Sequence, residues 1–440
     1  MTGLRCGAAR RGDIPFDFEG TDLLDIAASV LVLTALLAWI NQRFLRLPTT
    51  IGVMATSLAL SLALVGLDEA GVAVGLHARE AALVGAIDFS QLLMQGMLSL
   101  LLFAGALHVD LAALRDYRWQ VGVLAFVGTA LSTVLVGVAL WAALAAFGLA
   151  VPLLACLLFG ALISPTDPIA VIGMLKSAGA PRNLEVVIAG ESLFNDGVGV
   201  VLFTLLLDMA LEGGTPTVPH AAGLLAREAG GGLVFGWALG LATCRLLRTV
   251  DAHAVAALLT LAAVVGGYTL ANHLHVSGPL AMVVVGLMVG QLGRDRGLPD
   301  DVRHHLGVFW ELVDDVLNAV LFVLVGMEVI TIHFPFGAGV AASVAVAAIV
   351  IALVARWLTV GLPVDLARPA FRLPPGSGHV LTWGGLRGGI SIALALALPA
   401  GPWRETLIGL TYAVVAFSIL VQGLSFGRLV RATLRPGAGA

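Results

Sequence analysis

The sequence is dominated by apolar runs of about 20 residues that follow one another with short polar connections. Each run is long enough to cross the hydrocarbon core of a bilayer as a helix. Charged residues make up only 12% of the 440 residues and the mean hydropathy is +0.99. A water-soluble fold cannot hide so much apolar surface. The sequence therefore predicts an all-α membrane protein.

We count thirteen such spans between two short polar ends. Residues 1–22 are expected to form an N-terminal tail, residues 23–424 a single transmembrane domain, and residues 425–440 a short cytoplasmic tail. The predicted spans are 23–40, 50–67, 88–107, 120–147, 152–175, 185–210, 229–246, 253–272, 277–293, 308–330, 338–358, 378–399 and 404–424.

Basic residues alternate strongly between the two sides of this topology. With the N-terminus outside, the inside loops hold 17 lysines and arginines and the loops on the other side hold 3. The positive-inside rule therefore predicts an inner-membrane protein with a cytoplasmic C-terminus. The net charge of −4 offers no basic surface for nucleic acid, and three cysteines form neither a disulfide framework nor a zinc site. No cofactor is expected.

The fifth span contains an acid between two prolines, in the segment Ser164-Pro165-Thr166-Asp167-Pro168. Each proline lacks an N–H, so the carbonyls of Ala161 and Ser164 lose their helical partners. Unsatisfied carbonyls are not tolerated in lipid, and such a break must line a cavity enclosed by protein. Broken helices at membrane depth mark ion and substrate sites in transporters.

The sixth span carries the polar sequence Glu191-Ser192-Leu193-Phe194-Asn195-Asp196. Ser192 and Asp196 are four residues apart and share a helix face, which Asn195 borders. Acids at membrane depth are costly and usually functional. We therefore expect Asp196 to lie at the centre of a site.

The twelfth span carries Arg387 among four glycines. Because an arginine cannot shed its charge, a buried Arg387 needs an anion, and Glu191, Asp167 and Asp196 are the candidates. Thr166 and Arg387 are 221 residues apart, about half the chain. This spacing predicts inverted repeats that bring two discontinuous helices, spans 5 and 12, side by side.

The sequence also suggests roles for three other groups of polar residues. Asp314 and Asp315, with Glu311 and Asn318, could line a cytoplasmic cation funnel or form the solvated entry of span 10. His304 and His305 are expected in an inside loop, as ordinary loop histidines rather than as pH sensors. Arg356 is expected to snorkel from a span end.

Read together, these segments resemble the cation/proton antiporter family, in its NhaP and sodium/proton exchanger branch. The resemblance rests on Ile163 to Val171, Gly190 to Phe203 and Gly384 to Leu394, with Phe309 to Leu312 and Asn318 to Leu324 as a fourth piece. It implies a homodimer in which a core domain (about 120–210 and 338–424) moves like an elevator against a scaffold (about 23–107 and 229–330).

The resemblance also implies roles for the polar residues. Asp196 would bind either the cation or the proton, Ser192 and Thr166 would add oxygen ligands to Na⁺, and Asp167 would neutralise helix ends. Glu191 would pair with Arg387, and Asn195 stands where electrogenic relatives carry a second Asp. Many relatives have an acid in span 3 where this chain has Ala104, so no role of that acid transfers here.

The expected function is secondary antiport of Na⁺ (or Li⁺) against H⁺, electroneutral because one acid titrates. K⁺/H⁺ exchange remains the alternative, since the motifs do not separate the two cations. A cation channel is disfavoured because no repeated filter loop or ring of charge is visible. A membrane enzyme is disfavoured because the sequence contains no His-Glu-x-x-His, Walker loop or serine elbow.

Overall fold

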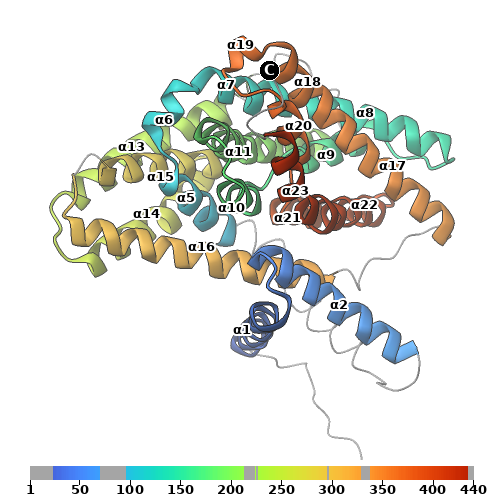
Figure 1. Cartoon of the computed structure of the whole chain (residues 1–440), viewed down its shortest axis with the longest axis horizontal. Helices are drawn as coiled ribbons and strands as arrows, with labels where there is room; N and C mark the ends of the chain where they lie inside the picture. Colours follow the sequence, from blue (N-terminus) through green and yellow to red (C-terminus); the bar gives the residue numbers. More distant parts are fainter. Residues whose placement is uncertain are drawn as a thin grey trace, which may run out of the picture.

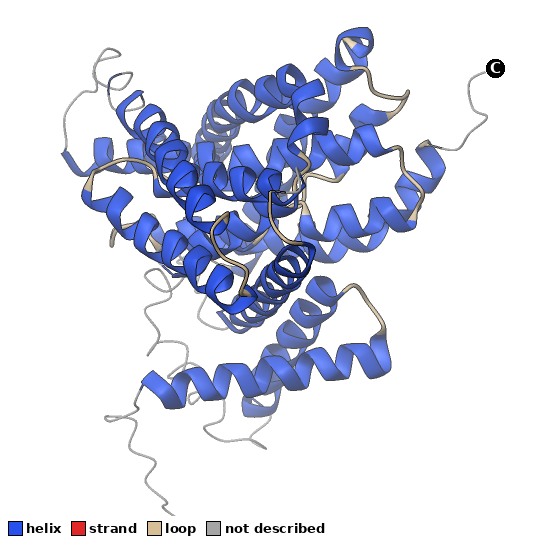
Figure 2. Cartoon of the chain, turned by 90° about the vertical axis from the view of Figure 1, so that its left-hand side faces the viewer, coloured by secondary structure: helices blue, strands red, loops and turns tan. Residues whose placement is uncertain are grey.

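The computed structural model describes residues 23–69, 96–212, 223, 226–294, 297–328 and 337–434. These residues are almost entirely helical, and none of them lies in a strand (Figure 2). The predicted tail 1–22 and the first part of the third predicted span fall outside the described residues. The all-α prediction is confirmed for the described residues.

Helices follow the predicted apolar runs closely. In the first half of the chain they are α1 (Leu23–Ile40), α2 (Thr49–Glu69), α5 (Leu98–His108), α6 (Leu111–Asp116), α7 (Arg118–Gly122), α8 (Thr129–Ala146), α9 (Leu153–Ile163), α10 (Ile169–Ser177) and α11 (Arg182–Glu212). In the second half they are α13 (Gly231–Leu247), α14 (His253–His273), α15 (Gly278–Arg294), α16 (Asp300–Glu328), α17 (Ala338–Arg356), α18 (Leu362–Leu366), α19 (Arg368–Phe371), α20 (Ser377–Trp383), α21 (Gly389–Leu396), α22 (Arg404–Phe417) and α23 (Leu424–Thr433).

Several ends differ from the predicted ones. α16 begins at Asp300, eight residues before the predicted start of its span, and so includes His304 and His305 in its first turns instead of leaving them in a loop. The predicted tail after residue 424 begins as α23, whose Phe426 and Val430 are buried. Both extensions are amphipathic, which a search for uniformly apolar runs does not detect.

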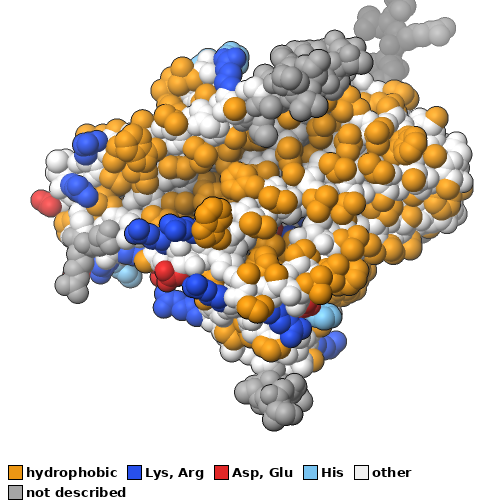
Figure 3. Space-filling view, turned by 90° about the horizontal axis from the view of Figure 1, so that it is seen from above, with side chains coloured by type: hydrophobic (Ala, Val, Ile, Leu, Met, Phe, Trp, Pro, Cys, Tyr) orange, Lys and Arg blue, Asp and Glu red, His pale blue; other side chains and the backbone are white. Residues whose placement is uncertain are grey.

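The outer surface is largely apolar. Large side chains such as Leu31, Trp237 and Val346 are more than half exposed, and apolar side chains predominate on the face shown in Figure 3. Seven helical stretches within the described residues are long and apolar enough to cross a membrane, and shorter apolar helices accompany them. This surface is what a protein solvated by lipid requires.

Glycines allow the inner helices to approach closely. A Cβ built on Gly236 of α13 would lie 2.7 Å from the carbonyl oxygen of Ala281 on α15, and one on Gly286 of α15 would lie 2.6 Å from the carbonyl oxygen of Phe103 on α5. Small residues at such contacts are typical of helix packing in membranes. α16 crosses beneath α5, α13 and α15 and contacts α1 and α2 on its other side (Figure 1).

Two helices are interrupted near the middle of the molecule. The helix is interrupted between α9 and α10 at residues 164–168, and again between α20 and α21 at residues 384–388. The two breaks lie against each other, since the N–H of Asp167 donates to the carbonyl of Leu386 at 2.7 Å (Figure 1). The predicted pair of discontinuous helices is confirmed.

Arg387 stabilises the first break instead of pairing with an acid. Its guanidinium donates to the carbonyls of Ser164 and Pro165, the latter at 2.9 Å, and its backbone N–H donates to the Ser418 hydroxyl at 2.8 Å. Ser164 is the residue whose carbonyl loses its helical partner to Pro168. The positive charge therefore replaces a missing backbone donor.

The predicted ion pair between Glu191 and Arg387 is wrong. Both Glu191 oxygens accept from Arg356, at 2.6 and 2.7 Å, and both side chains are almost fully buried. The expectation that Arg356 snorkels is also wrong, because a π-helical segment, Trp357–Gly361, and α18 continue α17 to Leu366 and leave Arg356 in the interior of one long helical stretch. A bidentate pair of this kind joins α11 to α17.

We predict that Glu191→Gln and Arg356→Gln each lower the stability of the purified protein by about 3–5 kcal/mol, because each leaves a buried charge without its partner. The double variant should lose clearly less than the sum of the two. Thermal unfolding in detergent measures all three.

A matched control is the exposed pair of Arg182 and Asp110, which are 2.8 Å apart. Arg182→Gln should cost less than about 1 kcal/mol. Additive losses for Glu191 and Arg356, or losses no larger than that of the control, would show that the pair does not hold the two helices together.

Candidate functional site

Asn195 connects the middle of α11 to the break between α9 and α10. Its side-chain oxygen accepts from the Thr166 N–H at 3.2 Å, and its amide nitrogen donates to the Thr166 hydroxyl at 2.8 Å. The same nitrogen donates to Glu191 at 2.7 Å. Asn195 therefore fixes the non-helical backbone of the break relative to the Glu191–Arg356 pair.

Two hydroxyls face each other beside this contact. The Thr166 and Ser192 oxygens are 3.0 Å apart, and both side chains are buried. Neutral oxygens are the ligands that a hard cation accepts alongside a carboxylate. The predicted oxygen ligands are thus brought together, although they lie 26 residues apart in the sequence.

Asp196 lies one turn beyond Ser192 on α11 and is 7% exposed. Among the described residues, no side chain or N–H donates a hydrogen bond to its carboxylate, and none forms a salt bridge with it. Asp196 instead lines a cavity of about 430 Å³ together with Thr166 and Asp167. A buried carboxylate that borders a cavity without a protein partner is available to a small cation or a proton.

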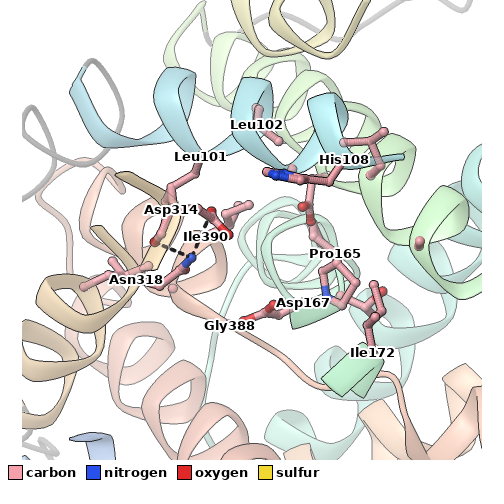
Figure 4. Close-up of a pocket in the computed structure, with 18 of the residues that line it drawn as sticks. Leu101, Leu102, His108, Pro165, Asp167, Ile172, Asp314, Asn318, Gly388 and Ile390 are labelled. Atoms are coloured by element: carbon pink, nitrogen blue, oxygen red, sulfur yellow. Dashed lines mark hydrogen bonds between the residues drawn. The ribbon is translucent and has the colours of Figure 1, made fainter. Parts of the chain in front are cut away.

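The cavity lies between the broken helices and three other helices. Figure 4 shows Leu101, Leu102 and His108 of α5 along one side, Asp314 and Asn318 of α16 on a second, and Pro165, Asp167 and Gly388 from the two breaks on a third. Its wall therefore combines both breaks with α5, α11 and α16. Segments that are far apart in the sequence meet around one space.

Most charges on the cavity wall are acidic. The acids are Asp167, Asp196, Glu311, Asp314 and Asp315. Lys176 and His108 also line it, at the C-terminal ends of α10 and α5. A concave surface of predominantly one sign raises the local concentration of cations.

The structure decides the interpretation of the acidic group on α16. Asp314 and Asp315 lie near the middle of this helix of 29 residues, so they are not its solvated entry. The Asn318 amide donates to the Asp314 carboxylate at 3.1 Å and to the Asp314 backbone carbonyl at 2.9 Å. These two bonds orient the side chains of Asn318 and Asp314 in the cavity wall (Figure 4). The group lines the cavity that reaches Asp196.

Asp167 is half-buried and lies at the contact between the two breaks. A Cβ built on Gly388 would come within 2.7 Å of an Asp167 carboxylate oxygen. Glycine at position 388 is therefore needed for the second break to approach this acid. The residues brought together at the crossing are those the sequence predicted, apart from the partner of Glu191.

Two features of the wall were not predicted. His108 is exposed and lies at the end of α5, with its Nδ1 2.8 Å from the carbonyl of Ala104. Lys176 lies in the last turn of α10, one residue beyond the predicted end of the fifth span. Ala104 itself is fully buried. Only the three-dimensional arrangement reveals that α5 faces the same cavity as α16.

Comparison with known proteins agrees with this geometry. Residues 32–432 match the family described as sodium/hydrogen exchanger, transmembrane. The chain is 50% identical over 414 residues to the Na(+)/H(+) antiporter NhaP of Pseudomonas aeruginosa, which covers 93% of this chain and 96% of that protein. It is 36% identical over 314 residues to the Na(+)/H(+) antiporter NhaH of Halobacillus dabanensis, covering 70% of this chain and 74% of that protein.

A solved structure shares the fold. The sodium proton antiporter MjNhaP1 from Methanocaldococcus jannaschii superposes with a TM-score of 0.72 at 20% sequence identity, covering 92% of this chain and 97% of that one. The arrangement of helices is therefore that of a known transporter. The chain is a multi-span membrane protein that belongs to the sodium/hydrogen exchanger family.

Proposed function

We propose that this protein exchanges Na⁺ for H⁺ across the membrane and that both ions bind the Asp196 carboxylate in turn. The observation that supports this most directly is the position of Asp196, which is buried, borders an acidic cavity and accepts no hydrogen bond from the described residues. The curated relatives that cover most of the chain are named Na⁺/H⁺ antiporters.

Competition for one carboxylate couples the two fluxes. A proton and a metal ion cannot occupy the same oxygens together, so the arrival of one requires the departure of the other. Moving the neutralised site through the membrane is far cheaper than moving a bare carboxylate. An empty site therefore remains where it is, and uncoupled leakage is suppressed.

The neighbouring oxygens would complete the cation site. Ser192 lies one turn before Asp196 on α11, and its hydroxyl is already in contact with that of Thr166. We propose that these two hydroxyls bind Na⁺ with Asp196. Asn195 then holds Thr166 in position, and Asp167 keeps negative charge at the crossing of the two breaks.

The acids of α16 would collect cations for this site. Asp314 and Asp315 line the same cavity as Asp196, so a cation entering the cavity passes their carboxylates. With the N-terminus outside the inner membrane, as the distribution of arginines favours, the ends of α5 and α10 that carry His108 and Lys176 face the cytoplasm. The cavity then opens inward.

The contacts favour two bodies that move relative to each other. α9, α10, α20 and α21 are joined through Arg387 and the contact of Asp167 with Leu386, and α11 is joined to α17 through Glu191 and Arg356. α5, α13, α15 and α16 pack together on the other side of the cavity. We propose that the first group belongs to a mobile core and the second to the scaffold of a homodimer.

We predict that Asp196→Asn abolishes Na⁺-dependent proton movement, because an amide neither carries the charge that attracts Na⁺ nor binds the exchanged proton. The assay is dissipation of a pH gradient in proteoliposomes on addition of Na⁺, Li⁺ or K⁺.

Asp315→Asn is the matched control, since it removes a carboxylate from the same cavity. It should retain exchange, with a weaker apparent affinity for Na⁺. Exchange by Asp196→Asn protein at the wild-type rate would reject the role of Asp196. If the wild-type protein responded to K⁺ and not to Na⁺ or Li⁺, the transported cation would be K⁺ instead of Na⁺.

We also predict electroneutral exchange of one Na⁺ for one H⁺, because position 195 is an amide that titrates no second proton. The rate in proteoliposomes should be the same when valinomycin and a K⁺ gradient impose a membrane potential of either sign. A rate that follows the imposed potential, or a current on a supported membrane, would contradict this stoichiometry.

A further inference from the structure

A cluster of two histidines and one aspartate lies away from the transport cavity, where the beginnings of α14 and α16 meet. His253 is the first residue of α14, and Asp301 and His305 lie one turn apart on α16. Each of the three side chains offers one ligand atom within 4.8 Å of those of the other two. Their side chains are about half exposed, so an ion from solution can reach them.

The two imidazoles converge on a single carboxylate. The Nδ1 atoms of His253 and His305 lie 3.6 and 3.2 Å from the two different oxygens of Asp301. In a tetrahedral site with metal–ligand bonds near 2.0–2.1 Å, ligand atoms are roughly 3.4 Å apart. The observed separations are close to that value but run to two different oxygens of Asp301, so the side chains must rotate to bring one oxygen and both nitrogens around a single ion.

The two imidazole rings also stack on each other beside the Asp301 carboxylate. The ring centroids are 4.5 Å apart and the planes are 21° from parallel. Two imidazoles beside a carboxylate are ligands suited to a borderline divalent ion.

We propose that His253, Asp301 and His305 bind a divalent transition-metal ion of the Zn²⁺ class, with water in the remaining position. Binding through Nδ1 of His305 replaces its present contact with the Asp301 carbonyl, at 2.9 Å. The ion would join the first turn of α14 to the first turns of α16. α16 is also the helix that carries Asp314 and Asp315 into the transport cavity.

The neighbouring charges leave Asp301 available for this role. Asp300 forms a separate salt bridge with Arg303 at 2.7 Å. His304 is exposed and touches the edge of the His305 ring, with centroids 5.6 Å apart, but it is not a member of the converging group. His304 is therefore a control that differs from His305 by one position on the same helix.

The test uses the full chain, purified without a polyhistidine tag, freed of metal with a chelator and then titrated with Zn²⁺ or Ni²⁺. We expect one ion to bind each chain and the thermal unfolding temperature to rise. His253→Ala and His305→Ala should each weaken binding by about tenfold or more, whereas His304→Ala should bind like the wild type. Mg²⁺, which prefers oxygen ligands, should not compete.

Cu²⁺ provides a second readout that does not depend on stability. Its EPR spectrum should show coupling to two imidazole nitrogens in the wild type and to one in His305→Ala. Asp301→Asn serves if an alanine variant does not fold, and it should weaken Zn²⁺ binding as well. Stoichiometric binding that survives His253→Ala and His305→Ala alike, or no bound ion in the wild type, would overturn the proposal.

Discussion

The hydrogen bonds between the two broken helices are the contacts on which the rest of the site depends. Prolines remove backbone donors from the first break, and a carbonyl left without a donor at membrane depth costs several kcal/mol. The Arg387 guanidinium donates to two carbonyls of the first break, and the Asp167 N–H of that break donates to the carbonyl of Leu386 in the second. A non-helical backbone can therefore persist among helices and present Thr166 to α11.

The same hydrogen bonds hold the residues around Asp196 in place and leave the Asp196 carboxylate itself without a hydrogen bond from the described residues. Glu191 is held by Arg356 and Asn195, and Thr166 is held by Asn195 and Ser192. Asp196 borders the cavity without such restraints from the described residues. The polar groups that would compete for its carboxylate are thus already satisfied by one another. In our account, this leaves the carboxylate to the transported ions.

The sequence predicted the spans and the helix breaks of this site better than it predicted the partners of the buried charged residues. Apolar runs located the spans, and the prolines and glycines located both breaks, because these signals are local. The partner of Arg387 could not be predicted, since the choice between an acid and a freed carbonyl depends on which helix lies beside it. Arg356 was misassigned because the apolar run ended near it while the helix continued. The walls contributed by α5 and α16 likewise depend on packing between distant segments.

The most direct test of the shared carboxylate is the proton released when Na⁺ binds. Metal-free protein in weakly buffered detergent solution is mixed with Na⁺, and the released protons are counted with a pH indicator, with choline as the control cation. Our account predicts about one proton released per chain by the wild type and none by Asp196→Asn protein. Na⁺ binding by the wild type without proton release, or equal release by the Asp196→Asn variant, would contradict it.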